Sequence, residues 1–440
     1  MRTSLLTVIG AATLGACTSS TPGVNAGATP AATSGCCLQA GLHVAERHRV
    51  DAITARRFTH AELWSALDPV VRSSPALSMR EVGRSVQGRP IRAITYGTGP
   101  ATVLLWSQMH GDESTATMAL ADIVSWLAAP AVDDEAMRRR ISTGLTVVMV
   151  PMLNPDGAEL FQRQNAVGID VNRDARRLVT PEARALKALR DSIRPSFGFN
   201  LHDQSARNVA GRDGRQVAIA LLAPAADEER TYGPARTVAR QVAAGIVSVL
   251  APEVPGRIAR YDDTFEPRAF GDLMQQWGTS TVLIESGALP DDPEKQRLRA
   301  LNVAAMVSAL DAIATGRHAS ADVSAYESLP MNARVPSDVV ITGGTLVLPG
   351  TVLVRADLAI AYDDPVARRD PRVREVGDLA SYAAIDTIDA AGLFLHPDPA
   401  MLAERDGHHW LRIDAPVSLT IRRGRQATSE QVLTVGLPRR

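Results

Sequence analysis

Five continuous apolar runs, separated by segments with helical patterning, constrain the fold more than any other feature of the sequence. The runs are "ATVLLWS" (101–107), "LTVVMVPML" (145–153), "SFGFNLH" (196–202), "QVAIALLAP" (216–224) and "STVLIES" (280–286). Runs of this length without polar alternation are typical of strands buried on both faces. Strands that alternate with helices predict an α/β fold: a mixed, mostly parallel central sheet flanked by helices.

The residue pattern changes toward the C-terminus, which indicates a second domain after the α/β fold. The α/β pattern covers residues 56–316, and residues 317–336 form a weakly patterned linker. From 337 to 440, short β-branched runs are interrupted by Gly and Pro, for example "DVVITGGTLVLPGTVLVRADLAIAYDD". This composition predicts a small β-rich domain.

The N-terminus has the features of an export signal. Residues 1–17, "MRTSLLTVIGAATLGAC", have one positive charge and an apolar run shorter than the roughly 20 residues that span a bilayer. The "LGAC" at 14–17 resembles a bacterial lipobox, which implies lipid attachment at Cys17; a plain signal peptide cut elsewhere is the alternative. Residues 18–55 begin with a stretch rich in Ser, Thr, Ala, Gly and Pro and are expected to form a flexible tether. We therefore expect a periplasmic or cell-surface protein that contacts a membrane only through its lipid.

Composition excludes several classes of function. The formal net charge is −1 and aromatic residues make up 4% of the chain, which argues against a nucleic-acid partner. The three cysteines are Cys17, Cys36 and Cys37, all before the α/β region. A disulfide framework, a cysteine nucleophile and cysteine metal ligands in the fold are therefore excluded.

Chemically active side chains follow the ends of three apolar runs. His110 and Glu113 follow the first, His202 closes another, and Glu285 lies in "STVLIES". Active sites of open α/β sheets form where strands end. A catalytic zinc site needs three His or carboxylate ligands and a further carboxylate to accept a proton from water. The sequence supplies both sets.

Several motifs in order resemble the zinc metallocarboxypeptidase family, the carboxypeptidase A-like peptidases. "HGDE" (110–113) is similar to the family's His-x-x-Glu ligand pair and "LHD" (201–203) to its later histidine. Between them, "NPDGAELFQRQNAVGIDVNRD" (154–174) resembles the family's Asn-Pro-Asp-Gly stretch and its Gly-Val-Asp-Leu-Asn-Arg segment. The resemblance covers residues 56–316 and implies one zinc ion, a peptide or peptide-like substrate and carboxypeptidase activity.

The resemblance also implies residue roles. Zinc would be bound by His110, Glu113 and His202. Asp170 would orient His110 from behind, and Glu285 would be the general base.

Four further residues would act on the substrate. Arg163 would stabilise the developing oxyanion. Asn172 and Arg173 would hold the substrate's terminal carboxylate, and Tyr261 would contact the substrate from a loop.

One departure leaves the substrate open, and a second carboxylate leaves a choice of base. Relatives have an arginine inside the ligand segment where this chain has Asp112, and Glu266 is a rival to Glu285 for the role of base. Glu285 is preferred because it ends an apolar strand. An amidase or deacylase acting on cell-wall peptides or acylated amino acids, and a surface-tethered binding protein without catalysis, remain the alternatives.

Overall fold

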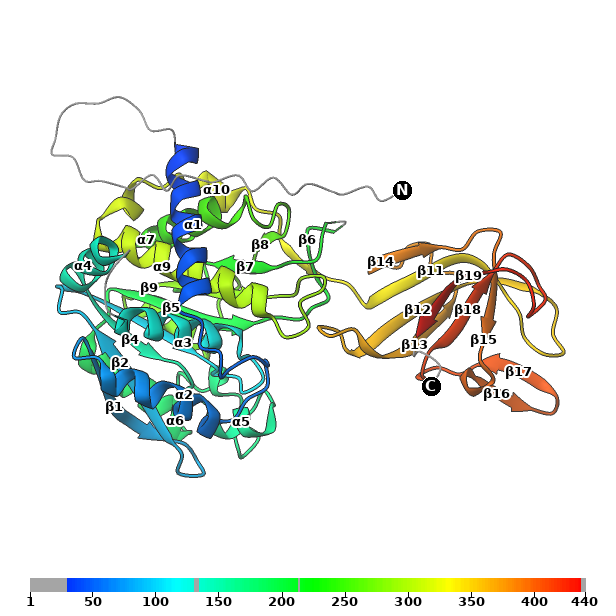
Figure 1. Cartoon of the computed structure of the whole chain (residues 1–440), viewed down its shortest axis with the longest axis horizontal. Coiled ribbons are helices and arrows are strands. Elements are labelled where there is room, and N and C mark those ends of the chain that lie inside the picture. Colours follow the sequence, from blue (N-terminus) through cyan, green and yellow to red (C-terminus); the bar gives the residue numbers. More distant parts are fainter. Residues whose placement is uncertain (1–29, 130–133, 213, 437–440) are drawn as a thin grey trace, which may run out of the picture.

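The computed structural model describes residues 30–129, 134–212 and 214–436, with side chains from residue 37 onward. These residues form an α/β body followed by a β-rich body (Figure 1). The predicted signal peptide at 1–17 and Cys17 lie outside the described residues.

An eight-stranded mixed sheet forms the centre of the α/β body. The order is β1 (Leu77–Arg84), β2 (Pro90–Tyr96), β4 (Leu145–Val150), β3 (Ala101–Ser107), β5 (Phe197–Asp203), β9 (Ser280–Ser286), β7 (Ile219–Leu222) and β8 (Ile258–Arg260). The central strands β4, β3, β5 and β9 are parallel neighbours. Pairs β1–β2, β2–β4 and β7–β9 are antiparallel. The predicted mixed α/β sheet is confirmed.

Helices cover both faces of this sheet, as the continuous apolar strands require. In β3, Val103 and Leu105 join one buried cluster, while Leu104 and Trp106 join another on the opposite face. The larger cluster includes α2 (His60–Ser73), α3 (Thr115–Ala128), α7 (Pro234–Leu250) and α9 (Gln296–Ala314). The smaller includes α6 (Pro181–Ile193) and α8 (Phe270–Gln276). Short helices α4 (Glu135–Gly144), α5 (Pro155–Leu160) and α10 (Ser324–Glu327) complete this body.

The predicted tether is partly wrong. Within residues 18–55, helix α1 spans Pro30–Arg47, and Leu38 and Val44 are buried in the larger cluster. A Cβ on Gly41 would lie 2.5 Å from the Cα of Ala304 in α9, so glycine allows the two helices to approach closely. Tertiary packing therefore orders a segment whose composition predicts flexibility.

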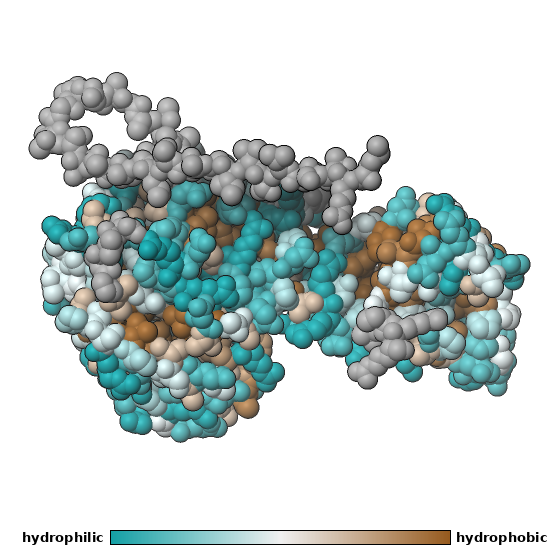
Figure 2. Space-filling model, viewed as in Figure 1, coloured by the Kyte–Doolittle hydropathy of each residue, from teal (hydrophilic) through white to brown (hydrophobic). Residues whose placement is uncertain are grey.

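The C-terminal body is β-rich, as predicted. Its main sheet contains β11 (Ser337–Leu346), β12 (Val354–Asp364), β13 (Arg369–Gly377), β14 (Ala384–Asp389), β15 (Phe394–Pro397), β18 (Ser418–Arg422) and β19 (Gln431–Gly436). A hairpin of β16 (Leu402–Arg405) and β17 (His408–Leu411) extends from it. This body buries an apolar cluster of its own, which includes Ile341, Leu358 and Leu419. In Figure 2 the visible surface of both bodies is largely hydrophilic, with smaller apolar areas.

The predicted linker contains structure that joins the two bodies. Within 317–336, η2 (Arg317–Ser320), α10 and β10 (Asn332–Arg334) form, and β10 pairs with β6 (Asn208–Ala210) of the α/β body. Beside this pairing, Arg207 donates from Nε and Nη2 to Oδ2 of Asp338 at 3.0 and 2.9 Å. Among the described residues, no helix is both long and apolar enough to cross a membrane.

Candidate active site

A tight turn after β3 positions the first two predicted ligands. The chain leaves the strand at Ser107, and His110 and Glu113 follow before α3 begins. A Cβ on Gly111 would lie 2.0 Å from the carbonyl carbon of Gly157 in α5. Only glycine allows this approach, so the "HGDE" turn is packed directly against the "NPDG" segment.

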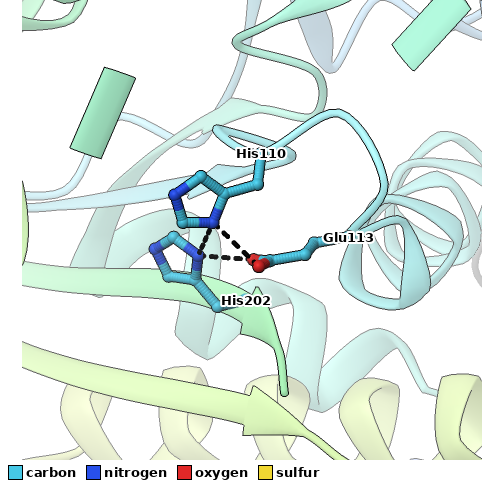
Figure 3. Close-up of side chains that lie close together, drawn as sticks. All are labelled: His110, Glu113 and His202. Atoms are coloured by element: carbon cyan, nitrogen blue, oxygen red, sulfur yellow. Dashed lines mark hydrogen bonds and ion pairs between the residues drawn. The ribbon is translucent and has the colours of Figure 1, made fainter. Parts of the chain in front are cut away.

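The predicted ligands converge on one point (Figure 3). Nδ1 of His110 lies 2.8 Å from Oε1 of Glu113, and Nδ1 of His202 lies 2.6 Å from Oε2 of the same carboxylate. The two ring nitrogens are 3.2 Å apart. One ligand atom from each residue falls within 4.8 Å of the others, and this is the one such group among the described residues.

This donor set fits zinc. Two imidazole nitrogens and one carboxylate oxygen are the ligand types of catalytic zinc sites, which leave a fourth position open. Two Nδ1 atoms facing each other at 3.2 Å cannot both carry a proton, and a shared cation relieves that conflict. The residues therefore suit a single metal ion.

Asp170 and Arg163 support this group from behind. Nε2 of His110 donates to Oδ1 of Asp170 at 3.0 Å, which leaves Nδ1 free to bind a metal. Nη2 of Arg163 lies 2.9 Å from the other oxygen of Asp170. Nη1 of Arg163 points to Oε1 of Glu113 at 3.3 Å. The guanidinium therefore lies at the edge of the ligand group.

The electrostatics of the three ligands are strongly coupled. Burial lowers the pKa of His110, but the Glu113 carboxylate and the bond to Asp170 outweigh it and raise the pKa to about 9. Burial dominates at His202, whose pKa is lowered. Burial raises the pKa of Glu113, but the two histidines outweigh it and hold the pKa well below its usual range. The cluster therefore favours an ionised Glu113 carboxylate facing a positively charged His110.

Glu285 lies beside this group on the neighbouring strand. It pairs in register with His202 across β5 and β9, and it is 9% exposed. Burial and the nearby Glu113 carboxylate raise its pKa well above the ordinary value. Tyr261 is close enough that the Glu285 carboxylate, together with burial, raises the tyrosine pKa to about 12.

The rival carboxylate has a different environment. Oε2 of Glu266 lies 3.4 Å from Nε of Arg173, and Arg268 donates to both Glu266 oxygens at 2.9 Å. The hydrogen bond from Arg268 lowers the pKa of Glu266 despite burial. An anion held by two arginines is a poor proton acceptor, so the environment favours Glu285 as base.

Asn172 links the metal group to helix α8. Its Oδ1 accepts from the backbone N–H of Phe270 at 2.9 Å, and its Nδ2 lies 3.5 Å from Nε2 of His202. Asp170 caps the short helix η1 (Val171–Arg173) by accepting from the Asn172 N–H at 2.8 Å. The "GIDVNRD" segment is thereby fixed against the ligands.

One cleft of about 1060 Å³ joins these residues. Its lining includes almost every predicted site residue: His110, Glu113, Arg163, Asn172, Arg173, His202, Tyr261 and Glu285. Asp170 is not among the lining residues, which agrees with its position behind His110.

A buried ion pair at the site was not predicted. Nζ of Lys295 lies 2.9 Å from Oδ2 of Asp203, and both side chains are at most 9% exposed. Thr115 donates to the same oxygen at 2.6 Å, while the Asp203 N–H donates to Oε2 of Glu113 at 3.2 Å. The position of Asp203 next to His202 was a usable signal, but nothing in the sequence marks Lys295.

Comparisons with known proteins agree with the sequence motifs. Residues 64–205 match the family model described as zinc carboxypeptidase. Carboxypeptidase E of Caenorhabditis elegans is 28% identical over 154 residues, which are 30% of this chain and 33% of that protein. Carboxypeptidase SOL1 of Arabidopsis thaliana is 26% identical over 167 residues, 34% of each chain. The chain thus spans about a third of the length of these curated relatives.

Solved structures match part of this chain at low identity. A metallo-carboxypeptidase from Burkholderia cenocepacia is 21% identical with a TM-score of 0.47, over 59% of this chain and 70% of that one. A metallo-carboxypeptidase from Pseudomonas aeruginosa in complex with (2-guanidinoethylmercapto)succinic acid is 17% identical with a TM-score of 0.45, over 58% and 70%.

The sequence matches support similarity to the zinc carboxypeptidase family over part of this chain, which for the family model is residues 64–205. The matched segment 64–205 contains His110, Glu113 and His202. Glu285 and Tyr261 lie beyond it, so their roles rest on their position beside the ligands.

Proposed function

We propose that this protein hydrolyses a peptide bond next to a free C-terminal carboxylate, with one zinc ion and Glu285 as general base. The observation that carries the proposal is the convergence of His110, Glu113 and His202 with a buried Glu285 on the adjacent strand. A site that only binds has no need of a second carboxylate with a raised pKa beside three ligands.

The chain's residues supply the proton transfers. When bound, zinc would polarise the substrate carbonyl and lower the pKa of a water molecule from 15.7 to about 7. Glu285 would accept a proton at its carboxylate from the water whose oxygen attacks the carbonyl carbon. Glu285, protonated by this step, would then give the proton to the leaving amine as the C–N bond breaks. The products are a new carboxyl group, which loses its remaining proton to solvent, and a free amine.

Two sets of residues would position the substrate. Arg163 lies at the edge of the ligand group, where its guanidinium stabilises the negative oxygen that forms during attack. The planar guanidinium of Arg173 would donate two hydrogen bonds to the substrate's terminal carboxylate, and Asn172 would contact the same carboxylate. In the free protein, Arg173 instead faces Glu266, so the substrate would displace that partner. Tyr261 would contact substrate beside Glu285.

The test compares two glutamates in the same cleft. Hydrolysis of a blocked dipeptide with a free C-terminus is measured for the wild type, Glu285→Gln and Glu266→Gln, each with and without a chelator. Chelation and Glu285→Gln should each remove activity by at least a hundredfold, while Glu266→Gln retains measurable turnover. Full activity of Glu285→Gln would refute the mechanism, and loss only in Glu266→Gln would move the base to the rival.

The second candidate function is amidase or deacylase activity, and Asp112 favours it. Asp112 lines the cleft where relatives have an arginine, and its Oδ1 is buried without a partner. One expected cationic contact to the substrate is thus replaced by a carboxylate. Peptides with free and amidated C-termini separate the two functions, because amidation abolishes only carboxypeptidase activity.

Export with lipid attachment at Cys17 is a further proposal that rests on the sequence of residues 1–17 alone. Labelling of the expressed protein with a fatty-acid analogue tests it. The wild type should take up label and Cys17→Ser should not.

A further inference from the structure

Part of the cleft wall comes from the C-terminal β-rich body. The end of β12, the turn that follows and the start of β13 contribute Asp363, Asp364, Pro365, Val366 and Arg369 to the lining, and β10 contributes Arg334. On the α/β side the wall continues through Ala55, Arg56 and Arg57, which precede helix α2. We call residues 363–369 the wall loop. The substrate cleft is therefore shared by two bodies with separate apolar cores.

Arg56 holds the wall loop against the metal-binding turn. Its guanidinium pairs with the Asp364 carboxylate, and its backbone oxygen accepts from the hydroxyl of Ser114, the residue after Glu113. Its backbone N–H donates to Glu294 at 2.9 Å. The side chains of Arg56 and Asp364 are 15% and 23% exposed, so the pair is largely shielded from water. The loop is thus fixed by direct contacts next to the ligands.

This end of the cleft is separate from the proposed carboxylate pocket. Asn172 and Arg173 contact Phe270 and Glu266, and neither has a hydrogen bond or ion pair with the wall loop. If the terminal carboxylate binds at Arg173, the part of the substrate before the cleaved bond extends past the ligands toward the wall loop.

The two carboxylates of the wall loop are paired with arginines. Asp364 is paired with Arg56 and with Arg369, the latter at 3.0 Å. Asp363 forms an ion pair at 3.0 Å with Arg372, and Arg372 does not line the cleft. Glu294 accepts from a backbone N–H, as described above.

Two arginines remain available. Arg57 and Arg334 are exposed and line the cleft, and within the described chain neither side chain has a carboxylate at ion-pair distance. The Arg57 guanidinium lies 5.6 Å from the ring centre of Phe161, which also lines the cleft. This stacking directs the side chain without satisfying its N–H groups.

From these contacts we infer that the wall loop, Arg57 and Arg334 form a subsite for an acidic residue of a short peptide, on the amino side of the cleaved bond. The inference rests on the proposed hydrolase function. Arginine presents several N–H donors to a carboxylate, and the wall loop limits how far the peptide can extend. The β-rich body therefore takes part in substrate selection.

The first test varies the charge of the substrate. Peptides of the form blocked-X-Phe, with X as Glu, Gln or Lys and a free C-terminus, are compared by kcat/KM at low ionic strength. We expect Glu to be preferred over Gln by about five- to tenfold, the effect of two partly exposed ion pairs. In Arg57→Gln/Arg334→Gln this ratio should fall toward one. Arg405→Gln, an exposed arginine outside the cleft, is the matched control and should keep the wild-type ratio. Equal rates for the three peptides in the wild type would overturn the inference.

The second test varies the length of the substrate. Replacing residues 365–368 by Asn-Gly shortens the turn between β12 and β13 to a two-residue hairpin. This variant should gain activity on peptides of six residues relative to dipeptides, by at least fivefold over the wild type. An unchanged length profile in a variant that unfolds at the wild-type temperature would overturn the role of the loop.

Binding separates this inference from the proposed function. The affinity of Glu285→Gln for blocked Glu-Phe and Gln-Phe is measured by calorimetry, with and without the Arg57 and Arg334 changes. If no peptide is hydrolysed by the wild type but the Glu peptide binds more tightly through these arginines, the function fails and the subsite stands. If peptides are hydrolysed but neither rate nor binding depends on X, the function stands and the subsite fails.

Discussion

Replacing Asp170 by Asn should weaken zinc binding without removing any ligand. The carboxylate accepts from Nε2 of His110 at 3.0 Å and therefore keeps the Nδ1 lone pair directed at the metal position. Asparagine can still accept through its amide oxygen, but it carries no negative charge to raise the basicity of the imidazole. Changes to such supporting groups typically lower metal affinity by 10–100-fold. This corresponds to about 1.4–2.8 kcal/mol, since each tenfold is about 1.4 kcal/mol.

Asp174→Asn is the matched control. Asp174 is also a buried carboxylate of the "GIDVNRD" segment, but it accepts from the N–H groups of Val179 and Thr180 at 2.8 and 2.7 Å, at the start of α6. Its loss should lower thermal stability and leave zinc affinity unchanged. Zinc affinity is measured by competition with a chelator of known affinity at pH 7.5. An Asp170→Asn affinity within twofold of the wild type, or an equal loss in Asp174→Asn, would refute the role assigned to Asp170.

Three further predictions concern buried charges. Arg299→Met should lower the free energy of unfolding, measured by denaturant titration, by about 3–5 kcal/mol. It would leave the buried Asp122 carboxylate without the two hydrogen bonds of 2.5 and 2.7 Å that Arg299 donates. The double variant Asp122→Leu/Arg299→Met should be more stable than Arg299→Met alone, because no unpaired charge remains. Burial raises the pKa of Asp272 from 3.8 to about 7. Between pH 4 and 7 the folded state therefore keeps a proton on Asp272 that the unfolded chain has lost, so the stability of the wild type falls as pH rises. Relative to Asp272→Asn, the loss measured by denaturant titration should be on the order of 4 kcal/mol. Lys295→Met should lower the melting temperature and slow hydrolysis, since it leaves Asp203 unpaired beside the ligands, and an unchanged melting temperature would contradict this.

The sequence predicted those parts of the site that depend on strand ends. His202 and Glu285 end neighbouring parallel strands, so their proximity follows from the topology of an open α/β sheet. His110 and Glu113 follow a third strand of the same group. Apolar runs mark these strands unmistakably, because both of their faces must be buried.

Apolar runs and strand ends do not predict contacts between segments that are far apart in the sequence. Arg56 and Asp364 are 308 positions apart, and no local pattern marks them as partners. Lys295 likewise reaches Asp203 from the loop before α9. Helix α1 was missed because its order comes from packing on α9 and not from its composition. In each case a three-dimensional contact overrides the local signal.

Because two bodies form the cleft, damage to the β-rich body and damage to the catalytic residues should have different effects. All proposed metal ligands and Glu285 lie between residues 110 and 285, whereas the wall loop lies at 363–369. A proteolytic cut or local unfolding in the β-rich body would therefore open the cleft without dismantling the chemistry. The damaged enzyme would act on more substrates, so heat or protease treatment should broaden specificity before it abolishes turnover.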